Sequence, residues 1–238
     1  MQFLDLTLRT LAENLALDEA LLLEADAGRG SEVLRLWEWR EYAVVLGAGC
    51  RTADEVDEDA CLADGVPIAR RASGGGTVLL GPGCLCYSLV LSYERSPALR
   101  EVRPSFAWIL ERICEALLDI EPSIERAGTS DLAIRGRKFS GNAQQRKRAY
   151  LLHHGTILYD FDIERIGRYV RMPARQPEYR SGREHPAFLM NLPASAQEID
   201  ASLRRAWQAS PVNLMYAQEQ SRELARTKYA NRDWIHRR

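Results

Sequence analysis

The sequence predicts an α+β fold in which a mixed, largely antiparallel β-sheet is flanked by helices. Three observations support this prediction. Long helical patterns occupy the N-terminal and central parts of the chain. Short runs rich in β-branched and aromatic residues are separated by glycine-containing turns. Strands and helices do not alternate strictly, as a parallel α/β fold would require. The 238 residues, 46% of them hydrophobic, suffice for one sizeable domain.

The first 91 residues are expected to contain one long helix and several strands. Residues 10–27 predict the helix, with Leu11, Leu15 and Leu22 on one side, and glycines from Gly28 onward end it. The segments expected after it are paired strands at 33–39 and 43–46, a short acidic helix within 54–64, a strand at 66–70, and strands at 77–80 and 85–91 that form a hairpin around Gly81-Pro82-Gly83.

The rest of the chain combines a helix with a second hairpin. Residues 105–118 predict the helix, because Ile109, Ile113 and Leu117 share one face. Later segments are two short strands at 132–134 and 138–143 that form a hairpin around Gly136, a strand at 154–159, and helical patterns beyond residue 162 with a proline-rich loop over 171–193.

Cysteine usage and hydropathy suggest a cellular compartment. The five cysteines are odd in number and lack CxxC spacing, which favours reduced thiols in the cytosol. Cys84 and Cys86 are expected to pack in the core, since free cysteine is among the most buried residue types. No apolar run approaches the ~20 residues of a membrane span. The N-terminus does not resemble a signal peptide. We therefore expect a cytoplasmic protein.

Charge is distributed unevenly along the chain. Residues 1–64 carry 15 acidic and 5 basic side chains, whereas the remainder carries 18 acidic and 27 basic ones. The basic part predicts an anionic ligand or an acidic partner, although an uneven solvated surface is the alternative. No dense basic run interleaves with aromatic residues, so no nucleic-acid partner is expected. Of 32 basic residues only Lys138, Lys147 and Lys228 are lysines.

A glycine-rich segment is the first candidate site. It runs Arg70-Arg71-Ala72-Ser73-Gly74-Gly75-Gly76-Thr77. Its glycines allow backbone N–H groups to approach a phosphate or carboxylate closely, and Arg71 can add a bidentate grip on the same anion. The spacing matches neither a Walker loop nor a GxGxxG fingerprint. A flexible hairpin with incidental arginines is the alternative interpretation.

A second candidate segment joins Ser130-Asp131 to Gly136-Arg137-Lys138-Phe139-Ser140-Gly141. Strand alternation predicts that Lys138 and Ser140 share a face and that Phe139 points to the other. Lys138 can reach a phosphate as a compact charge, and Asp131 can hold a magnesium ion together with substrate phosphates. A solvated lysine at a sheet edge is the alternative for Lys138.

The third candidate segment is His153-His154-Gly155-Thr156. Adjacent histidines in a strand face opposite sides, so the pair cannot grip one metal ion. With four histidines in the chain and no cysteine nearby, a zinc site is not expected. One imidazole can face a pocket while the other packs, or both can be hydrogen-bonded structural residues.

The order of these segments resembles the catalytic domain of the lipoate–protein ligase family, which is related to biotin–protein ligases and lipoyl/octanoyl transferases. The resemblance extends to Asn14–Glu19, to Trp37-Glu38-Trp39 and to the tail from Lys228-Tyr229 to Trp234, so it covers nearly the whole chain. It implies one acyl-nucleotide pocket within a single catalytic domain over residues 1–238, without a C-terminal accessory domain.

The resemblance implies an ATP- and magnesium-dependent ligase that activates lipoate or octanoate as acyl-AMP and passes it to a carrier lysine. Lys138 is the implied catalytic contact to the α-phosphate and acyl carbonyl. An acidic lipoyl-domain or H-protein-like carrier is the implied partner, and a separate small subunit is a possible accessory. The residues implied in acyl-adenylate binding are Glu19, Arg71, Ser73, Gly74, Gly75, Gly76, Thr77, Ser130, Asp131, His154 and Thr156. Ser130 stands where ligases of the family often carry asparagine.

The sequence is compatible with two other functions. Related octanoyl transferases hold the acyl chain on a cysteine, either just upstream of the GRK segment or after the HG-type strand, and need no ATP. Residues 121–137 and 157–238 contain no cysteine, and nothing beside Cys84 looks like an activating base. The sequence therefore favours the adenylate route. The other alternative is a non-catalytic lipoyl- or nucleotide-binding relative, against which the intact lysine and glycine segments argue.

Overall fold

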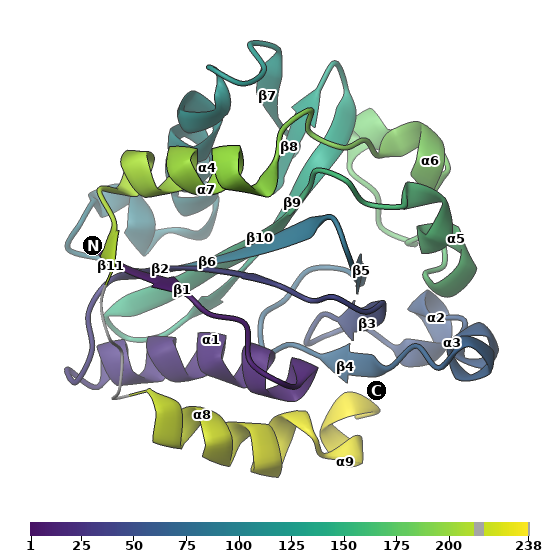
Figure 1. Ribbon diagram of the computed structural model, residues 1–238, viewed down its shortest axis with the longest axis horizontal. Coiled ribbons are helices and arrows are strands. Elements are labelled where there is room, and N and C mark those ends of the chain that lie inside the picture. Colours follow the sequence, from purple (N-terminus) through teal and green to yellow (C-terminus); the bar gives the residue numbers. More distant parts are fainter. Residues whose placement is uncertain (212–216, 238) are drawn as a thin grey trace.

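The computed structural model describes residues 1–211 and 217–237, in which an eight-stranded sheet forms the centre of the molecule (Figure 1). The strand order is β11-β1-β2-β6-β10-β9-β8-β7. The strands, in chain order, are β1 (Gln2–Asp5), β2 (Val33–Glu38), β6 (Cys84–Ser92), β7 (Ile124–Ala127), β8 (Asp131–Ile134), β9 (Arg137–Arg146), β10 (Tyr150–Leu158) and β11 (Ser210–Pro211). β1 pairs in parallel with both neighbours and the other pairings are antiparallel, so the predicted α+β fold with a mixed, largely antiparallel sheet is confirmed.

A small sheet packs beside the large one. Its order is β4-β3-β5, formed by β3 (Ala43–Leu46), β4 (Ile68–Arg70) and β5 (Val78–Leu80). Two short helices, α2 (Thr52–Glu55) and α3 (Glu58–Asp64), connect β3 to β4. They replace the single acidic helix expected within 54–64.

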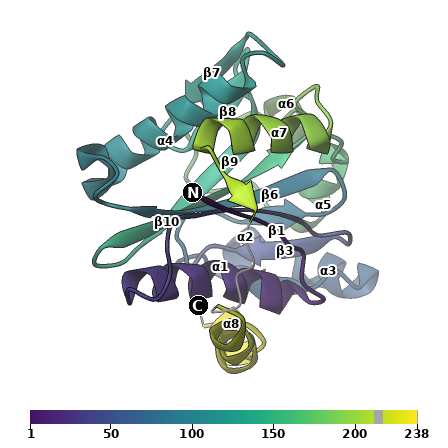
Figure 2. The same ribbon diagram turned by 60° about the vertical axis from the view of Figure 1, so that its left-hand side comes forward.

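Helices cover both faces of the large sheet (Figures 1 and 2). α4 (Val102–Leu117) and α7 (Ala196–Trp207) lie over one face. α1 (Leu11–Asp26) lies over the other, with α8 (Gln218–Leu224) packed outside it. The shorter elements are η1 (Pro97–Arg100), η2 (Ile163–Arg165), α5 (Ile166–Tyr169), η3 (Glu178–Arg180), α6 (His185–Phe188), η4 (Ala225–Tyr229) and α9 (Arg232–Ile235).

Helix α1 shows how local signals and packing combine. Thr10 caps its first turn, accepting from the Glu13 backbone N–H while the Glu13 carboxylate accepts from the Thr10 N–H. Most of the helix is buried, including polar residues, because the sheet covers one side and α8 the other. A helix enclosed in this way has no single polar face from which its orientation could be predicted.

The structure corrects two strand pairings. Strands β2 and β3 do not pair, because β2 joins the large sheet and β3 the small one. The segments around Gly81-Pro82-Gly83 are not a hairpin either, since β5 pairs with β3 and β6 with β2 and β10. Gly83 adopts a φ of +79°, and a Cβ there would lie 2.1 Å from the Asp160 backbone. The glycines therefore carry the chain from one sheet into the other.

The β8–β9 hairpin around Gly136 is confirmed. No helix within residues 1–211 and 217–237 is long and apolar enough to cross a membrane.

Candidate functional site

The floor of the site is formed by side chains from five neighbouring strands of the large sheet. The strand registers place one row across the sheet on the face toward α1, and a second row lies two residues along. The first row is Trp37, Cys86, Thr156, Gly141 and Asp131, and the second is Arg35, Ser88, His154 and Ala143. Residues far apart in sequence thus meet on one surface.

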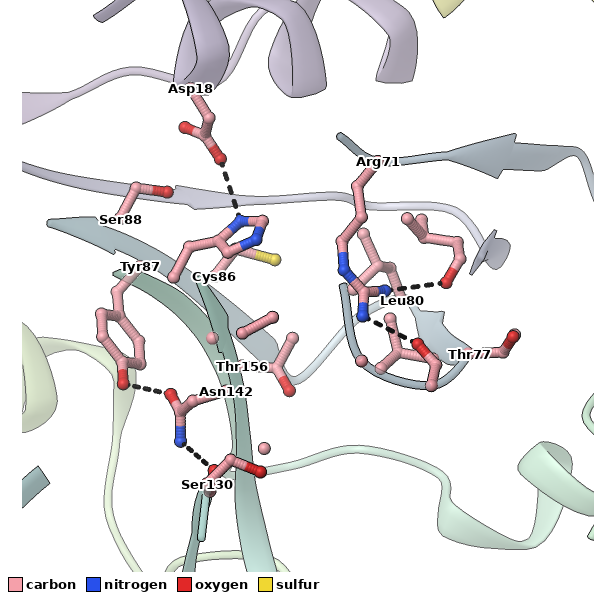
Figure 3. A pocket seen from close by; sticks show the side chains of 18 of the residues that line it. Asp18, Arg71, Thr77, Leu80, Cys86, Tyr87, Ser88, Ser130, Asn142 and Thr156 are labelled. Atoms are coloured by element: carbon pink, nitrogen blue, oxygen red, sulfur yellow. Dashed lines mark hydrogen bonds and ion pairs between the residues drawn. The ribbon is translucent and has the colours of Figure 1, made fainter. Parts of the chain in front are cut away.

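Two adjoining cavities lie above this floor (the first is shown in Figure 3). The first has a volume of about 170 Å³, and its walls include Leu15, Trp37, Val45 and Leu80. The second, of about 420 Å³, is bordered by the segment from Val170 to Leu189. The residues that line both are Gly76, Thr77, Val78, Ser130, Asp131, Lys138, Gly141 and Thr156. The glycine segment and the GRK segment therefore meet at the junction of the cavities.

Lys138 lies at that junction. Its Nζ is 2.8 Å from Asp131 Oδ1, and the other Asp131 oxygen accepts a hydrogen bond of 2.8 Å from the Tyr179 hydroxyl. Burial and the neighbouring Asp131 charge raise the pKa of Tyr179, so the phenol stays protonated and donates. Gly141 leaves room for the lysine, because a Cβ at Gly141 would lie 2.6 Å from Nζ.

Ser140 does not share a face with Lys138, contrary to the strand alternation expected from the sequence. A register shift in the β8–β9 pairing places Ser140 opposite Leu132 and Lys138 opposite Ala133. The extra residue of such a bulge reverses the alternation. Ser140 Oγ accepts a hydrogen bond from Asn142 Nδ2. The Oδ1 of the same asparagine accepts one from the Tyr87 hydroxyl beneath the floor.

The sequence suggested that Arg71 grips an anion bidentately, but in the structure its guanidinium is bonded to the protein itself. Its guanidinium donates to the Gly74 and Gly76 carbonyls at 2.7 and 2.8 Å, and also to Val45 O and Ser73 Oγ. Burial lowers its pKa to about 10, which still leaves it charged at neutral pH. The arginine therefore holds the shape of the glycine segment, whose backbone borders the first cavity.

His154 belongs to a chain of polar groups at the α1 side of the first cavity. Its Nδ1 lies 3.7 Å from Asp18 Oδ2, and its Nε2 lies 2.5 Å from Ser73 Oγ (the first contact is the dashed line drawn from Asp18 in Figure 3). Asp18 also pairs with the buried Arg35 at 2.6 Å. Burial alone would raise the pKa of Asp18, but the Arg35 charge together with the contacts to His154 and Ser88 outweighs burial, so the pKa is lowered.

The neighbouring His153 faces the opposite side of the sheet, as alternation predicts. It is fully buried against Phe106 and Tyr87. Burial and then the charge of His154 lower the pKa of His153 to about 3, so this imidazole is neutral at physiological pH.

Of the predicted site residues, Ser73 and Gly74 line neither of the two cavities, and neither does Glu19. Its carboxylate is turned toward the C-terminal segment, where it pairs with Lys228. Asp18, its neighbour on α1, lines the first cavity instead. Thr77 lies at the junction and donates to Glu55, another residue of the second cavity.

The sequence did not single out Asp18, Asn142, Tyr179 or Glu55, and it did not single out Trp37 as a cavity residue. Asp18 and Trp37 lie within segments that carry the family resemblance and Asn142 directly follows Gly141, so for these three the motif was the available signal. Tyr179 carried no such signal, because it lies in a proline-rich stretch far from Asp131 in sequence.

The cysteines lie in unreactive surroundings. All five are free and buried. Cys86, which lines the first cavity, has a raised pKa because of its bond to Cys84 and its burial. Cys50 donates to the Gly75 carbonyl at 3.3 Å, and burial followed by Glu55 raises its pKa. A raised pKa keeps a thiol protonated and weakly nucleophilic.

Comparisons with known proteins identify the family. The model of the lipoyl protein ligase A/B catalytic domain matches residues 10–203. The chain belongs to this family. An octanoyltransferase LipM from Carboxydothermus hydrogenoformans is 32% identical, over 95% of this chain and 94% of its own.

Solved structures agree in fold. The bi-partite lipoate protein ligase of Thermoplasma acidophilum, studied with its E2 lipoyl domain, gives a TM-score of 0.83 at 22% identity, covering 99% of this chain and 96% of that one. A lipoate-protein ligase A bound with ATP gives 0.81 at 22% identity, covering 99% of both chains. At these identities the structures establish the fold, and the curated relatives together with the family model establish an enzyme of the lipoate ligase and octanoyltransferase group.

Proposed function

We propose that this family member is an ATP-dependent lipoate–protein ligase, which activates lipoate or octanoate as acyl-AMP and transfers the acyl group to a carrier lysine. The observation that carries the proposal is the position of Lys138. Its ammonium lies where an apolar-walled cavity meets a larger one bordered by Arg171, Arg175 and Arg180. A mixed anhydride of a fatty acid and a nucleotide has its reacting centre at such a junction.

The first cavity suits an acyl chain in length. Gly141 on β9 and Trp37 on β2 are three strands apart in one row, and neighbouring strands are ~4.8 Å apart, so the row spans roughly 14 Å between backbones. An extended eight-carbon chain with bonds near 1.5 Å is about 9 Å long. Such a chain, starting beside Lys138, ends over Cys86 and against the Trp37 ring.

In the first half-reaction the acyl carboxylate oxygen attacks the α-phosphorus of ATP, and pyrophosphate leaves with the electron pair of the broken P–O bond. Negative charge accumulates on the α-phosphate oxygens as this bond forms. Lys138 supplies a compact positive charge at that point, and the glycine segment borders the same space with backbone groups. Asp131 orients the lysine while the substrate arrives.

A magnesium ion accompanying ATP is compatible with the residues present. Among the described residues no cluster of three or more metal-ligating side chains exists. Magnesium bound to phosphates commonly takes only one or two carboxylates, and Asp131 and Glu55 both line the second cavity. The ion, when bound, would neutralise phosphate charge. We propose Asp131 as its protein ligand, with Glu55 as the other available carboxylate.

In the second half-reaction the free amine of a carrier lysine attacks the acyl carbonyl carbon, and AMP leaves as the amide forms. Exposed Arg171 and Arg175 at the second cavity favour an acidic carrier such as a lipoyl domain. The bi-partite ligase among the structural neighbours supports the further proposal that a separate accessory subunit assists this chain. The proposed catalytic unit comprises residues 1–238.

A second candidate function is octanoyl transfer between carriers without ATP, which the relatives named octanoyltransferase LipM favour. That route needs a cysteine that becomes acylated. The raised pKa values of Cys86 and Cys50, and the absence of cysteine from residues 121–137, support the adenylate route instead.

Acid-dependent exchange of labelled pyrophosphate into ATP tests the proposal, run with lipoate, octanoate and biotin. Exchange with lipoate or octanoate is expected. Lys138→Ala should slow it by about 10²–10³-fold, the usual cost of removing one charge-stabilising donor. No exchange with any acid, together with an acyl-enzyme formed without ATP from an acyl carrier protein, would reject the ligase in favour of the transferase.

A further inference from the structure

The C-terminal segment, residues 225–235, contacts helix α1 through a buried charged cluster. Lys228 Nζ donates to both carboxylate oxygens of Glu19, at 2.9 and 2.7 Å, and the Tyr229 hydroxyl donates to Glu19 Oε2 at 2.8 Å. Gln145 Nε2 on β9 adds a fourth bond of 2.9 Å. We call Glu19, Lys228, Tyr229 and Gln145 the Glu19 cluster. It joins three segments that are distant in sequence.

The Glu19 cluster is built around a carboxylate that depends on its partners. Glu19 is 5% exposed. Burial by itself would raise its pKa, but the bond and charge of Lys228 together with the bonds from Gln145 and Tyr229 outweigh burial and lower it. Lys228 and Tyr229 belong to η4, a π-helical turn. Turns of this kind are rare and occur frequently at functional sites.

Two further contacts tie the C-terminal segment to the strand before the glycine segment. Trp234 Nε1 donates to the Arg70 carbonyl at 2.9 Å, and Arg70 Nε donates to the Ile235 carbonyl at 2.8 Å. The Tyr229 hydroxyl also interacts with the Ala72 backbone. The segment therefore contacts both α1 and the base of the glycine segment.

The C-terminal segment therefore contacts α1 and the glycine segment behind the wall of the first cavity. Asp18 precedes Glu19 on helix α1 and lines the first cavity. Ser73 follows Ala72 in the chain and contacts His154. A void of about 10 Å³ between the cluster and the cavity wall is lined by Tyr229, Ser73 and His154 among others. No cluster residue lines the second cavity.

We propose that Lys228 and Tyr229 are positioning residues for the acyl substrate, holding α1 and the glycine segment at the spacing that the acyl chain requires. This inference rests on the proposed function of the first cavity. Removal of Lys228 leaves the buried Glu19 carboxylate, which is adjacent to Asp18, without its charge partner. The wall of the first cavity then relaxes, and the anionic acid is repelled. The second cavity, where the proposed function places the nucleotide, has no wall residue from the Glu19 cluster and should be unaffected.

The test compares Lys228→Met, Lys228→Arg and the double variant Glu19→Gln/Lys228→Met. Arg226→Met serves as the matched control, because Arg226 lies two residues away and pairs with Glu223 on the surface. Pyrophosphate exchange is measured with octanoate and ATP varied separately. Octanoate affinity is measured in parallel by titration calorimetry without ATP, so the comparison does not depend on adenylation.

Lys228→Met should raise KM and Kd for octanoate by about tenfold, the loss expected for one charged hydrogen bond, with KM for ATP and kcat unchanged. Lys228→Arg should recover most of the affinity, and the double variant should bind better than Lys228→Met. A fall in kcat that follows the loss of folded protein, with unchanged KM and Kd for octanoate, would reduce the cluster to a structural role and overturn the inference. Octanoate binding by the wild type without any exchange would reject the ligase proposal and leave the calorimetric comparison valid.

Discussion

Replacing Gly141 by alanine is the most direct test of whether the position of Lys138 matters. A Cβ at Gly141 would lie 2.6 Å from Lys138 Nζ and 2.7 Å from Cε, and its next neighbour is Asp131 Oδ1 at 3.8 Å. Atoms this close must separate by about 1 Å, since carbon atoms in contact are ~3.5–4.0 Å apart. The end of a flexible lysine side chain gives way more easily than backbone. The methyl group should therefore displace the ammonium and spare the fold.

The expected magnitudes separate the two effects. Displacement should cost up to the whole contribution of the lysine, about 2.7–4 kcal/mol or 10²–10³-fold in exchange rate. Stability should change by no more than about 1 kcal/mol, the usual size for a substitution that requires no core rearrangement.

Two other glycines provide controls. Gly167→Ala introduces a Cβ with no atom within 4 Å and should leave both activity and stability near the wild type. Gly155→Ala places a Cβ 1.9 Å from Asn142 Oδ1 and 2.8 Å from the Gly141 carbonyl, so it should impair folding. Exchange rates and thermal unfolding are measured for all three variants. A Gly141→Ala protein that exchanges pyrophosphate at the wild-type rate would show that the observed lysine position is not required.

Four further predictions concern charge and the thiols. Arg35→Met removes the partner of buried Asp18 and should lower the free energy of unfolding by about 3–5 kcal/mol in urea titration; a change below 1 kcal/mol would contradict a buried pair. The lowered pKa of Asp18 means that its stabilising contribution is present above the unfolded-state pKa near 3.8 and is lost as pH falls through the folded-state value, so unfolding monitored by circular dichroism should show acid destabilisation that Arg35→Met diminishes. Cys86→Ser and Cys50→Ser should each retain pyrophosphate exchange, and an inactive Cys50→Ser protein that folds normally would point to a thioester route. Acylation of an acidic carrier should slow between 50 and 500 mM salt, on the order of several-fold, because screening weakens steering, whereas a salt-independent rate would remove the charge argument.

Much of the site was predictable because its chemistry is encoded locally. The glycine segment, Asp131 with Lys138, and His154 each stand in short motifs, and the structure brings them to one surface. The β8–β9 hairpin was predictable for the same reason, since Gly136 and the flanking apolar residues are close in sequence.

The errors share a cause, which is that pairing and orientation depend on distant residues. The turn at Gly81-Pro82-Gly83 was recognised, but nothing local states that β5 and β6 enter different sheets. The one-residue bulge that turns Ser140 away from Lys138 is equally invisible in a pattern of alternation. Arg71 lines the first cavity, but its guanidinium, expected to grip an anion bidentately, binds the Gly74 and Gly76 carbonyls of the loop.

By itself the sequence determined the family, the fold class and the residue that the proposed chemistry centres on, because Lys138 and its glycine neighbours form a motif within a few residues. Only the tertiary structure decided that Asp18 and not Glu19 faces the first cavity. Helix α1 is enclosed by the sheet on one side and α8 on the other, so both carboxylates are buried and hydropathy does not distinguish them. Their directions are set by partners from distant segments, Arg35 and His154 for one and Lys228 for the other.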